Sequence, residues 1–437
     1  MKVHLVSLGC ARNQVDSEVM AGRLSAAGMI VTVDPEAADV IVVNTCSFIE
    51  SAADESIDVI LNLAGHKRDG CCRRLVVTGC LPERYREAIV DALPEVDVFL
   101  GTGAYDRIVS AVQGDREAPK CVLPSPDHAG ILKTGAKRRL TDPHLAYLKI
   151  AEGCSRRCTY CIIPRLRGRQ KSRPMQTILN EAMELARSGV KELVLVAQDT
   201  TAYGRDLGWS GGLAGLLARL AEAVPDVWIR VMYGHPESLD RQTIHAVGEL
   251  APLCRYFDLP MQHASDSVLQ RMGRRCGADE LRALVETIRT RIPDAAIRTT
   301  FIVGFPGETD KDFQRLMNFV EQMRFDHLGA FTYSDGEDLP SHRLPDHVPK
   351  RVARERYDQL MQRQTDIAAD LNRRYVGRTC RVLVEENPEA GVFVGRTAFQ
   401  APEVDGVTFV QAQDLAVGCF AEIHISDALE YDLIGNT

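Results

Sequence analysis

Short apolar runs rich in β-branched residues alternate with segments of helical spacing, and this alternation constrains the fold more than any other feature. Within residues 1–113, strands are predicted at Val3–Leu8, Val40–Asn44 and Leu75–Thr78, with helices at Asp16–Ala27 and Ser51–Ala64 between them. Such runs are typical of buried parallel strands. Their alternation with helices predicts an α/β domain over residues 1–113, built on a doubly wound parallel sheet.

The second domain repeats the alternation after a break. Glycines and prolines interrupt every periodic pattern in residues 114–142, which predicts a linker. Six strands are predicted beyond it, with helical patterns between most of them: Ala146–Ile150, Leu193–Ala197, Trp228–Met232, Tyr256–Leu259, Ile297–Val303 and His327–Tyr333. Six β/α units indicate a partial barrel related to the complete eightfold barrel. With a long connecting helix at Arg351–Tyr375, this domain is predicted to span residues 143–372.

The last part of the chain changes to a strand-only pattern. Short strands are predicted at Cys380–Glu385, Val392–Phe399, Val407–Gln411 and Phe420–Ile425, with glycines between or before them. This pattern predicts a small β-barrel over residues 373–437, similar in size to an OB-fold.

Composition limits the compartment and the use of cysteine. The chain has 437 residues and no run approaching twenty apolar residues, and its first apolar run is too short for a signal peptide. We therefore expect a cytoplasmic protein that spans no membrane. In that compartment thirteen cysteines favour metal binding or thiol chemistry over disulfides.

Three cysteines follow predicted strands of the first domain. Cys10, Cys46 and Cys80 each lie two residues beyond a strand. Ligands of open parallel sheets bind outside the carboxyl ends of the strands, so these side chains are expected to converge. The alternative is three unrelated buried cysteines, because a free cysteine packs as a small hydrophobe. Cys71 and Cys72 precede their strand and are expected at its opposite end.

A second set of three cysteines lies in one loop after the first strand of the second domain. Cys154, Cys158 and Cys161 are spaced compactly, unlike the two cysteine pairs of a zinc ribbon. Three thiolates can hold a cubane iron–sulfur cluster and leave its fourth iron open to a substrate. Zinc bound by three cysteines and a histidine is the alternative, although no histidine lies within ten residues after Cys161.

The motif Cys154-x₃-Cys158-x-Tyr160-Cys161 resembles the radical S-adenosylmethionine (SAM) superfamily. The resemblance implies that a [4Fe-4S] cluster on these cysteines binds the amino and carboxylate groups of SAM and cleaves it to a 5′-deoxyadenosyl radical. It also implies cofactor contacts at Tyr160, at Gln198 toward the SAM amino group, and at Gly304 beside adenine. An external electron donor would be required.

The first domain and the terminal barrel resemble those of the methylthiotransferases, whose barrel is called TRAM. The resemblance rests on Leu8-Gly-Cys10-Ala-Arg-Asn13, Asn44-Thr-Cys46 and Thr78-Gly-Cys80. It implies an auxiliary [4Fe-4S] cluster on Cys10, Cys46 and Cys80 that takes part in sulfur insertion. Local strings such as Gln198-Asp-Thr-x-Ala-Tyr203 resemble the RimO type, which methylthiolates the β-carbon of an aspartate in the small-subunit ribosomal protein uS12. The MiaB type, which modifies adenosine in tRNA, is the alternative, and no catalytic base can be named.

The distribution of charge along the chain distinguishes a ribosomal-protein substrate from a tRNA substrate. Residues 373–437 hold five Lys and Arg against ten Asp and Glu, a net charge of −5, whereas residues 114–172 hold 13 against 5, or +8. A barrel that binds tRNA should be basic, because phosphate neutralisation dominates such affinity. The acidic barrel favours a basic ribosomal protein, and charge reversal at Glu385, Glu386 and Asp405 is expected to weaken its binding. An iron–sulfur electron carrier or redox-sensing binding protein is less favoured, because it would need neither the β/α barrel nor the TRAM-like domain.

Overall fold

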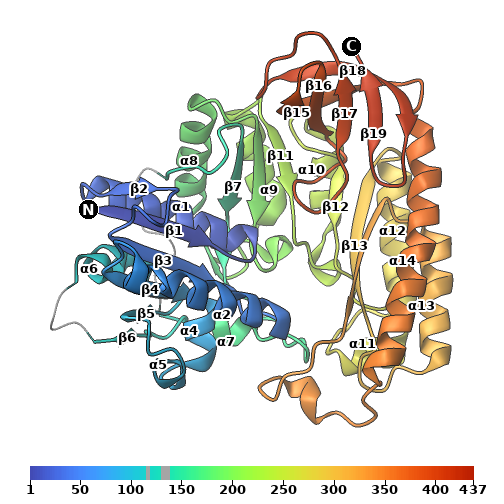
Figure 1. Cartoon of the computed structure of the whole chain (residues 1–437). Helices are drawn as coiled ribbons and strands as arrows, with labels where there is room; N and C mark the ends of the chain where they lie inside the picture. The colour runs from blue at the N-terminus through green and yellow to red at the C-terminus, as the bar shows by residue number, and fades with distance from the viewer. Residues whose placement is uncertain (115–118, 129–137) are drawn as a thin grey trace.

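The N-terminal domain is a six-stranded parallel sheet (Figure 1). The computed structural model describes residues 1–114, 119–128 and 138–437. The sheet has the order β2-β1-β3-β4-β5-β6, and its strands are β1 (Lys2–Ser7), β2 (Ile30–Thr32), β3 (Val40–Thr45), β4 (Arg74–Gly79), β5 (Val98–Leu100) and β6 (Cys121–Val122). Two apolar clusters lie on its two faces, one with α1 (Ala11–Ala26) and α6 (Ile108–Gln113), the other with α2 (Glu50–Ala64), α4 (Cys80–Tyr85) and α5 (Ala88–Ala92). The doubly wound prediction is confirmed.

The short outer strands of this sheet were not predicted. β2, β5 and β6 have only two or three residues, too few to show a hydrophobic period. β6 comes from the segment predicted as a linker, and Cys121 pairs with Phe99 in the sheet. Part of that segment is therefore sheet, while its residues 129–137 and the stretch 115–118 lie outside the described residues.

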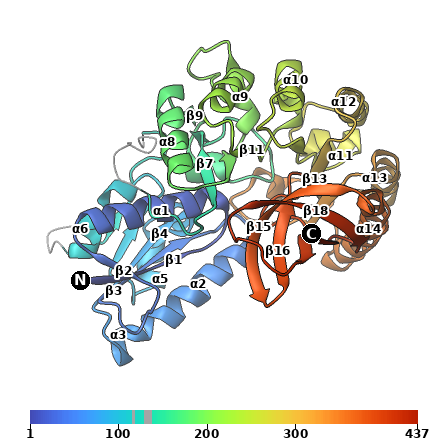
Figure 2. The same ribbon diagram turned by 90° about the horizontal axis from the view of Figure 1, so that it is seen from above.

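The central domain contains the predicted six parallel strands in two runs of three. The first run is β7 (Leu145–Lys149), β10 (Glu192–Val196) and β11 (Trp228–Val231), and the second is β12 (Tyr256–Asp258), β13 (Ala296–Val303) and β14 (His327–Thr332). A bridge between Ile229 and Leu253 connects the runs. Figure 2 shows the helices as an outer arc: α8 (Met175–Arg187), α9 (Gly212–Ala223), α10 (Arg241–Glu249), α12 (Ala278–Arg291) and α13 (Asp310–Met323). This arrangement confirms the partial barrel.

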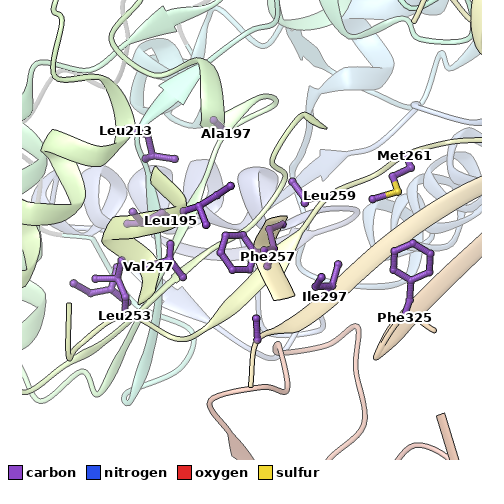
Figure 3. Packing of buried hydrophobic residues seen from close by; sticks show 14 of the residues in the cluster. Leu195, Ala197, Leu213, Val247, Leu253, Phe257, Leu259, Met261, Ile297 and Phe325 are labelled. Atoms are coloured by element: carbon purple, nitrogen blue, oxygen red, sulfur yellow. The ribbon is translucent and has the colours of Figure 1, made fainter. Parts of the chain in front are cut away.

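The main hydrophobic core lies between these strands and their helices (Figure 3). Leu195, Phe257 and Ile297 point outward from three different strands into this layer, where Val247 of α10 also packs. Full burial of one such side chain contributes roughly 1.5–3 kcal/mol. The predicted connecting helix is α14 (Lys350–Asn372), which packs against β14 and α13. Within the part of the chain that the structure describes, no helix has the length and apolar composition needed to cross a membrane.

The C-terminal domain is a closed five-stranded barrel in the order β15-β16-β17-β19-β18. Its strands are β15 (Thr379–Glu389), β16 (Val392–Thr397), β17 (Thr408–Gln411), β18 (Phe420–Ala428) and β19 (Leu433–Asn436). The predicted OB-like barrel is confirmed, although β19 was missed because it is short and contains Gly435. Figure 2 shows that this barrel and the N-terminal domain both lie on the open side of the helical arc.

Candidate active site

The first cysteine triad converges at the carboxyl edge of the N-terminal sheet. Cys10, Cys46 and Cys80 follow β1, β3 and β4, which are neighbours in the sheet. A Cβ atom on Gly9, whose φ is +91°, would lie 2.6 Å from the Cβ of Cys46, so the first two loops touch. Burial raises the pKa of Cys80 to about 11, and the nearby Cys46 and Cys10 thiols add to the shift. Three thiols from distant parts of the chain are therefore close neighbours.

Cys71 and Cys72 lie before β4, at the opposite end of that strand. Cys71 is exposed and Cys72 is buried, and the Cys72 thiol contacts the Arg74 carbonyl oxygen at 3.2 Å. Their position separates them from the triad, as expected.

The second triad lies in one loop between two short elements. Strand β8 (Ala151–Glu152), which pairs with β9 (Lys171–Ser172), precedes the loop, and helix α7 (Ile163–Arg167) follows it. The Cys154 amide donates to Gly168 O at 3.0 Å, which closes the base of the loop. Burial, with a smaller contribution from the neighbouring Cys158 and Cys154 thiols, raises the pKa of Cys161 to about 12. These thiols also share one small region.

Among the described residues, no group of three or more His, Cys, Asp or Glu side chains is gathered closely enough to hold one metal ion. Each triad supplies three thiols, the number that a cubane cluster with one open iron needs. The ligation of iron by either triad stays a prediction.

Gln198 has the free acceptor that the predicted SAM contact needs. It follows β10, and its Nε2 donates to Glu152 Oε1 at 2.6 Å. Its Oε1 is buried and has no hydrogen-bond partner among the described residues. A buried carbonyl oxygen without a donor is costly, and the amino group of SAM would supply that donor. The side chain therefore fits the group that the family resemblance implies.

Tyr160 is held beside the second triad by a cation. Its hydroxyl accepts hydrogen bonds from Arg274 at 2.7 Å and 3.2 Å, and its ring meets Phe305 edge-on at 6.4 Å. Arg274 also contacts Nε2 of His235 at 2.6 Å. Burial and the charge of Arg274 lower the pKa of His235 to about 2, so this histidine is neutral. Sequence reasoning missed Arg274, which follows α11 (Asp266–Arg271) and has no motif around it.

Gly304 lies at the end of β13 with φ +75°. A Cβ atom there would lie 2.3 Å from the Cβ of Ala353 on α14. The amide of Gly304 donates to Glu308 Oε2 at 2.6 Å. This glycine is therefore required by helix packing and by the turn, and its predicted closeness to adenine stays a prediction.

Arg167 connects the two triads. It lies six residues after Cys161 and reaches into the N-terminal domain, where its Nη1 donates to Asp16 at 2.8 Å and its Nη2 lies 3.6 Å from the Cys80 sulfur. Its side chain is 3% exposed. Lys149 at the end of β7 pairs with the same Asp16 at 2.5 Å. The basic segment around the second triad is thus partly buried and paired with acids of the other domain.

Arg12 forms a second connection. It lies two residues after Cys10, and its Nη1 donates to the carbonyl oxygen of Ala197, the residue before Gln198. Its guanidinium carbon lies 4.3 Å from the centre of the Tyr233 ring. Burial alone would raise the pKa of Cys10, but Arg12 and Arg167 hold it below its ordinary value. The only sequence signal for Arg12 was its place in the Leu8–Asn13 motif.

Two of the three barrel acids that were expected to affect substrate binding have partners within the protein. Asp405 accepts hydrogen bonds from Tyr256 at 2.6 Å and Ala401 at 2.8 Å, and its side chain is buried. Glu385 pairs with the buried Arg396. Both carboxylates are therefore paired inside the protein, and of the three acids only Glu386 is exposed.

Comparisons with known proteins agree with this architecture. Three family models match: the uncharacterized protein family UPF0004 over residues 2–101, the Radical SAM superfamily over 148–320, and the TRAM domain over 376–437. Similar proteins named ribosomal protein uS12 methylthiotransferase RimO include those of Desulfosudis oleivorans, 54% identical over all of this chain and 99% of the relative, and Clostridioides difficile, 47% identical over 100% and 98%.

A solved structure with a similar fold is the radical SAM methyltransferase TsrM of Kitasatospora setae. Its TM-score is 0.57 at 15% identity, and the match covers 78% of this chain and 75% of that one. The cobalamin-dependent radical enzyme OxsB matches with a TM-score of 0.51 at 14% identity, over 84% and 56% of the two chains. At these identities the likeness concerns the fold alone.

Proposed function

Because the chain belongs to the RimO family of radical SAM methylthiotransferases, we propose that it attaches a methylthio group to the β-carbon of an aspartate in ribosomal protein uS12. The relatives that carry this name match the chain over 99% or more of its length. The three domains that the family models describe lie in one polypeptide.

The two triads would each hold one [4Fe-4S] cluster. Cys154, Cys158 and Cys161 would hold the cluster that binds SAM, and Cys10, Cys46 and Cys80 would hold the auxiliary cluster. When bound, these cofactors would supply the methyl group, a site for sulfur insertion and a 5′-deoxyadenosyl radical that removes hydrogen from an unactivated carbon.

The protein's own groups would orient the cofactors and exclude water. Gln198 Oε1 would accept from the SAM amino group, and Tyr160, fixed by Arg274, would pack beside the cofactor at the second triad. His235 is held neutral and His263 is fully buried, with burial lowering its pKa to about 3. Neither histidine is thus available as a charged acid, which suits a reaction that breaks an apolar C–H bond.

One observation carries the proposal: Arg167, which follows the second triad in the chain, reaches Cys80 of the first triad. The substrate carbon would have to lie within reach of both cofactor sites, so the residues that hold them must adjoin. The contact of Arg167 with Cys80, from a helix directly after Cys161, supports such a shared reaction space.

The partner would be a basic protein, and the reaction would take place in the cytoplasm with an external electron donor. Seven acidic side chains of the barrel are exposed: Glu386, Glu389, Glu403, Asp414, Glu422, Asp427 and Glu430. This surface favours a basic ribosomal protein and disfavours tRNA. An electron carrier would need no SAM acceptor such as Gln198.

Mass spectrometry of uS12 and of tRNA, from cells with and without this gene, tests the proposal. We expect the mass increase of one methylthio group on uS12 only in cells that carry the gene. A methylthio group lost from tRNA adenosine instead would identify the MiaB-type activity. Iron binding by purified protein without 5′-deoxyadenosine formation would identify an electron carrier.

A further inference from the structure

Arg12 is a half-buried cation without a carboxylate partner at the junction of the two triads. Other cations here are paired with acids: Arg156 with Asp199, Arg167 with Asp16, and Lys149 with Glu152. Arg274 is bound by Tyr160 and His235. Among the residues that the structure describes, no carboxylate lies within ion-pair distance of Arg12; the Cys10 thiol interacts with it, and the Glu152 carboxylate acts on it more weakly from beyond that distance.

The surroundings of Arg12 fix its position but leave most of its donors unused. An arginine has five N–H donors, and the structure engages one of them, on Ala197 O at 3.0 Å. One face of the guanidinium is covered by the Tyr233 ring. Tyr233 has a φ of +60°, and its amide donates to Asp258 at 2.8 Å, which holds it there. Backbone strain of this kind, in a non-glycine residue, gathers at ligand sites.

The location of Arg12 matches where a substrate must bind. Arg12 follows Cys10 of the auxiliary triad by two residues, and its contact residue Ala197 precedes Gln198 of the SAM contact. A substrate carbon has to lie between these two sites in order to lose hydrogen at one and gain sulfur at the other. Arg12 would therefore lie beside that carbon.

We propose that Arg12 binds the carboxylate of the substrate aspartate and thereby positions its β-carbon between the two cofactor sites. The inference rests on the proposed function. The β-carbon of aspartate is bonded directly to the carboxylate carbon, so a bound carboxylate holds the reacting carbon within one bond. The planar fork of an arginine matches a carboxylate with two parallel hydrogen bonds. A nucleobase has no carboxylate, so the same contact selects an aspartate over adenosine.

If Arg12 served only to stabilise the thiolate of Cys10, a different result would be expected. In that case Arg12 would affect the auxiliary cluster and would be indifferent to the chemistry of the substrate side chain. An experiment that changes both the arginine and the substrate carboxylate distinguishes the two roles.

The experiment measures binding without turnover. Enzyme reconstituted anaerobically with iron and sulfide is titrated, without reductant, into a labelled uS12 peptide that holds either the target aspartate or asparagine. We expect the native enzyme to bind the aspartate peptide roughly 10- to 100-fold more tightly, the range for hydrogen bonds to a charged group. Arg12→Gln should lose this preference and bind both peptides equally, and Arg12→Lys should keep part of it. Arg68→Gln, on the exposed helix α3 (His66–Asp69), is the matched control and should behave as the native enzyme.

An unchanged preference for aspartate in Arg12→Gln, with iron content equal to the native enzyme, would overturn the assignment. If Arg12→Gln loads no iron, Arg12→Lys decides: a preference equal to the native one overturns it, and a reduced preference supports it. Failure of the native enzyme to modify uS12 would overturn the proposed function and this assignment together. A native enzyme that modifies uS12 but does not distinguish the two peptides refutes the role of Arg12 alone.

Discussion

Glu192 connects the central and C-terminal domains, and its removal should weaken that connection strongly. It begins β10 and is completely buried. Its two oxygens accept from Arg230 Nε at 2.6 Å and from Arg396 Nη2 at 2.7 Å, and Arg396 belongs to β16 of the barrel. Glu192→Ala therefore leaves two buried guanidinium groups without their shared carboxylate.

The expected loss of stability depends on which partners the two arginines keep in Glu192→Ala. Removing one partner of a buried ion pair costs about 3–5 kcal/mol, because the other charge stays buried and unpaired. Arg396 retains Glu385 and Arg230 retains the Ala398 carbonyl oxygen at 2.8 Å, so we expect the lower end, about 3 kcal/mol. The control is Glu222→Ala, whose carboxylate is 68% exposed and pairs with Arg219 on α9. An exposed pair of this kind contributes about 0.5 kcal/mol or less.

Tryptophan fluorescence reports on the contact between the central domain and the barrel. The chain has two tryptophans, and Trp228 packs against Phe420 of the barrel with ring centres 4.6 Å apart. In a Trp209→Phe background, urea should alter the Trp228 signal at a clearly lower concentration in Glu192→Ala than in Glu222→Ala. Equal midpoints for the two variants would refute the reasoning.

The same residue predicts a pH dependence. Burial alone would raise the pKa of Glu192, but Arg230 and Arg396 hold it below its ordinary value of 4.5. A depressed pKa means that the unfolded chain binds the proton more readily, so the stabilisation is complete above pH 4.5 and is lost as the pH falls below it. Glu192→Gln should therefore lose less stability than the native protein on acidification from pH 5 to pH 3.

Three further predictions concern the clusters, a glycine and the barrel. Replacing the second cysteine triad by alanine should leave about four irons per chain after anaerobic reconstitution, because the first triad belongs to another domain; near-zero iron would contradict independent sites. Gly304→Ala should destabilise the protein to urea by roughly 1–3 kcal/mol through its positive φ and its collision with Ala353, and Ala353→Gly should restore part of this loss. Reversing the exposed charges of Glu386, Glu389 and Glu422 should weaken uS12 binding, less so at high salt; unchanged binding at low salt would show that another surface holds the partner.

Much of the fold could be predicted because it depends on local patterns. The strands that were found, such as β3 and β13, have six and eight residues and are rich in β-branched side chains. The strands that were missed depend on tertiary pairing: β6 has two residues, and β19 forms only beside β17 and β18. A pattern of period two cannot be recognised in two residues.

The cysteines of the site could also be located, because the edge rule for parallel sheets converts sequence position into spatial position. The residues that connect the triads could not. Arg167 and Asp16 are 151 positions apart, and Arg12 and Ala197 are 185 apart. Such contacts depend on how the domains pack, and only the family motif around Cys10 drew attention to Arg12.

Net charge was the least reliable guide to the surface. The ten acids of the barrel predicted its sign correctly but not which side chains face outward. A buried acid must find a cation or several donors, and Glu385 and Asp405 find theirs in Arg396 and Arg298. Asp405 is thereby joined to the central domain, so part of the acidity fastens the domains together. The exposed acids that remain, including Glu386, are the ones free to attract a basic partner, and a charge count for a docking surface should begin from them.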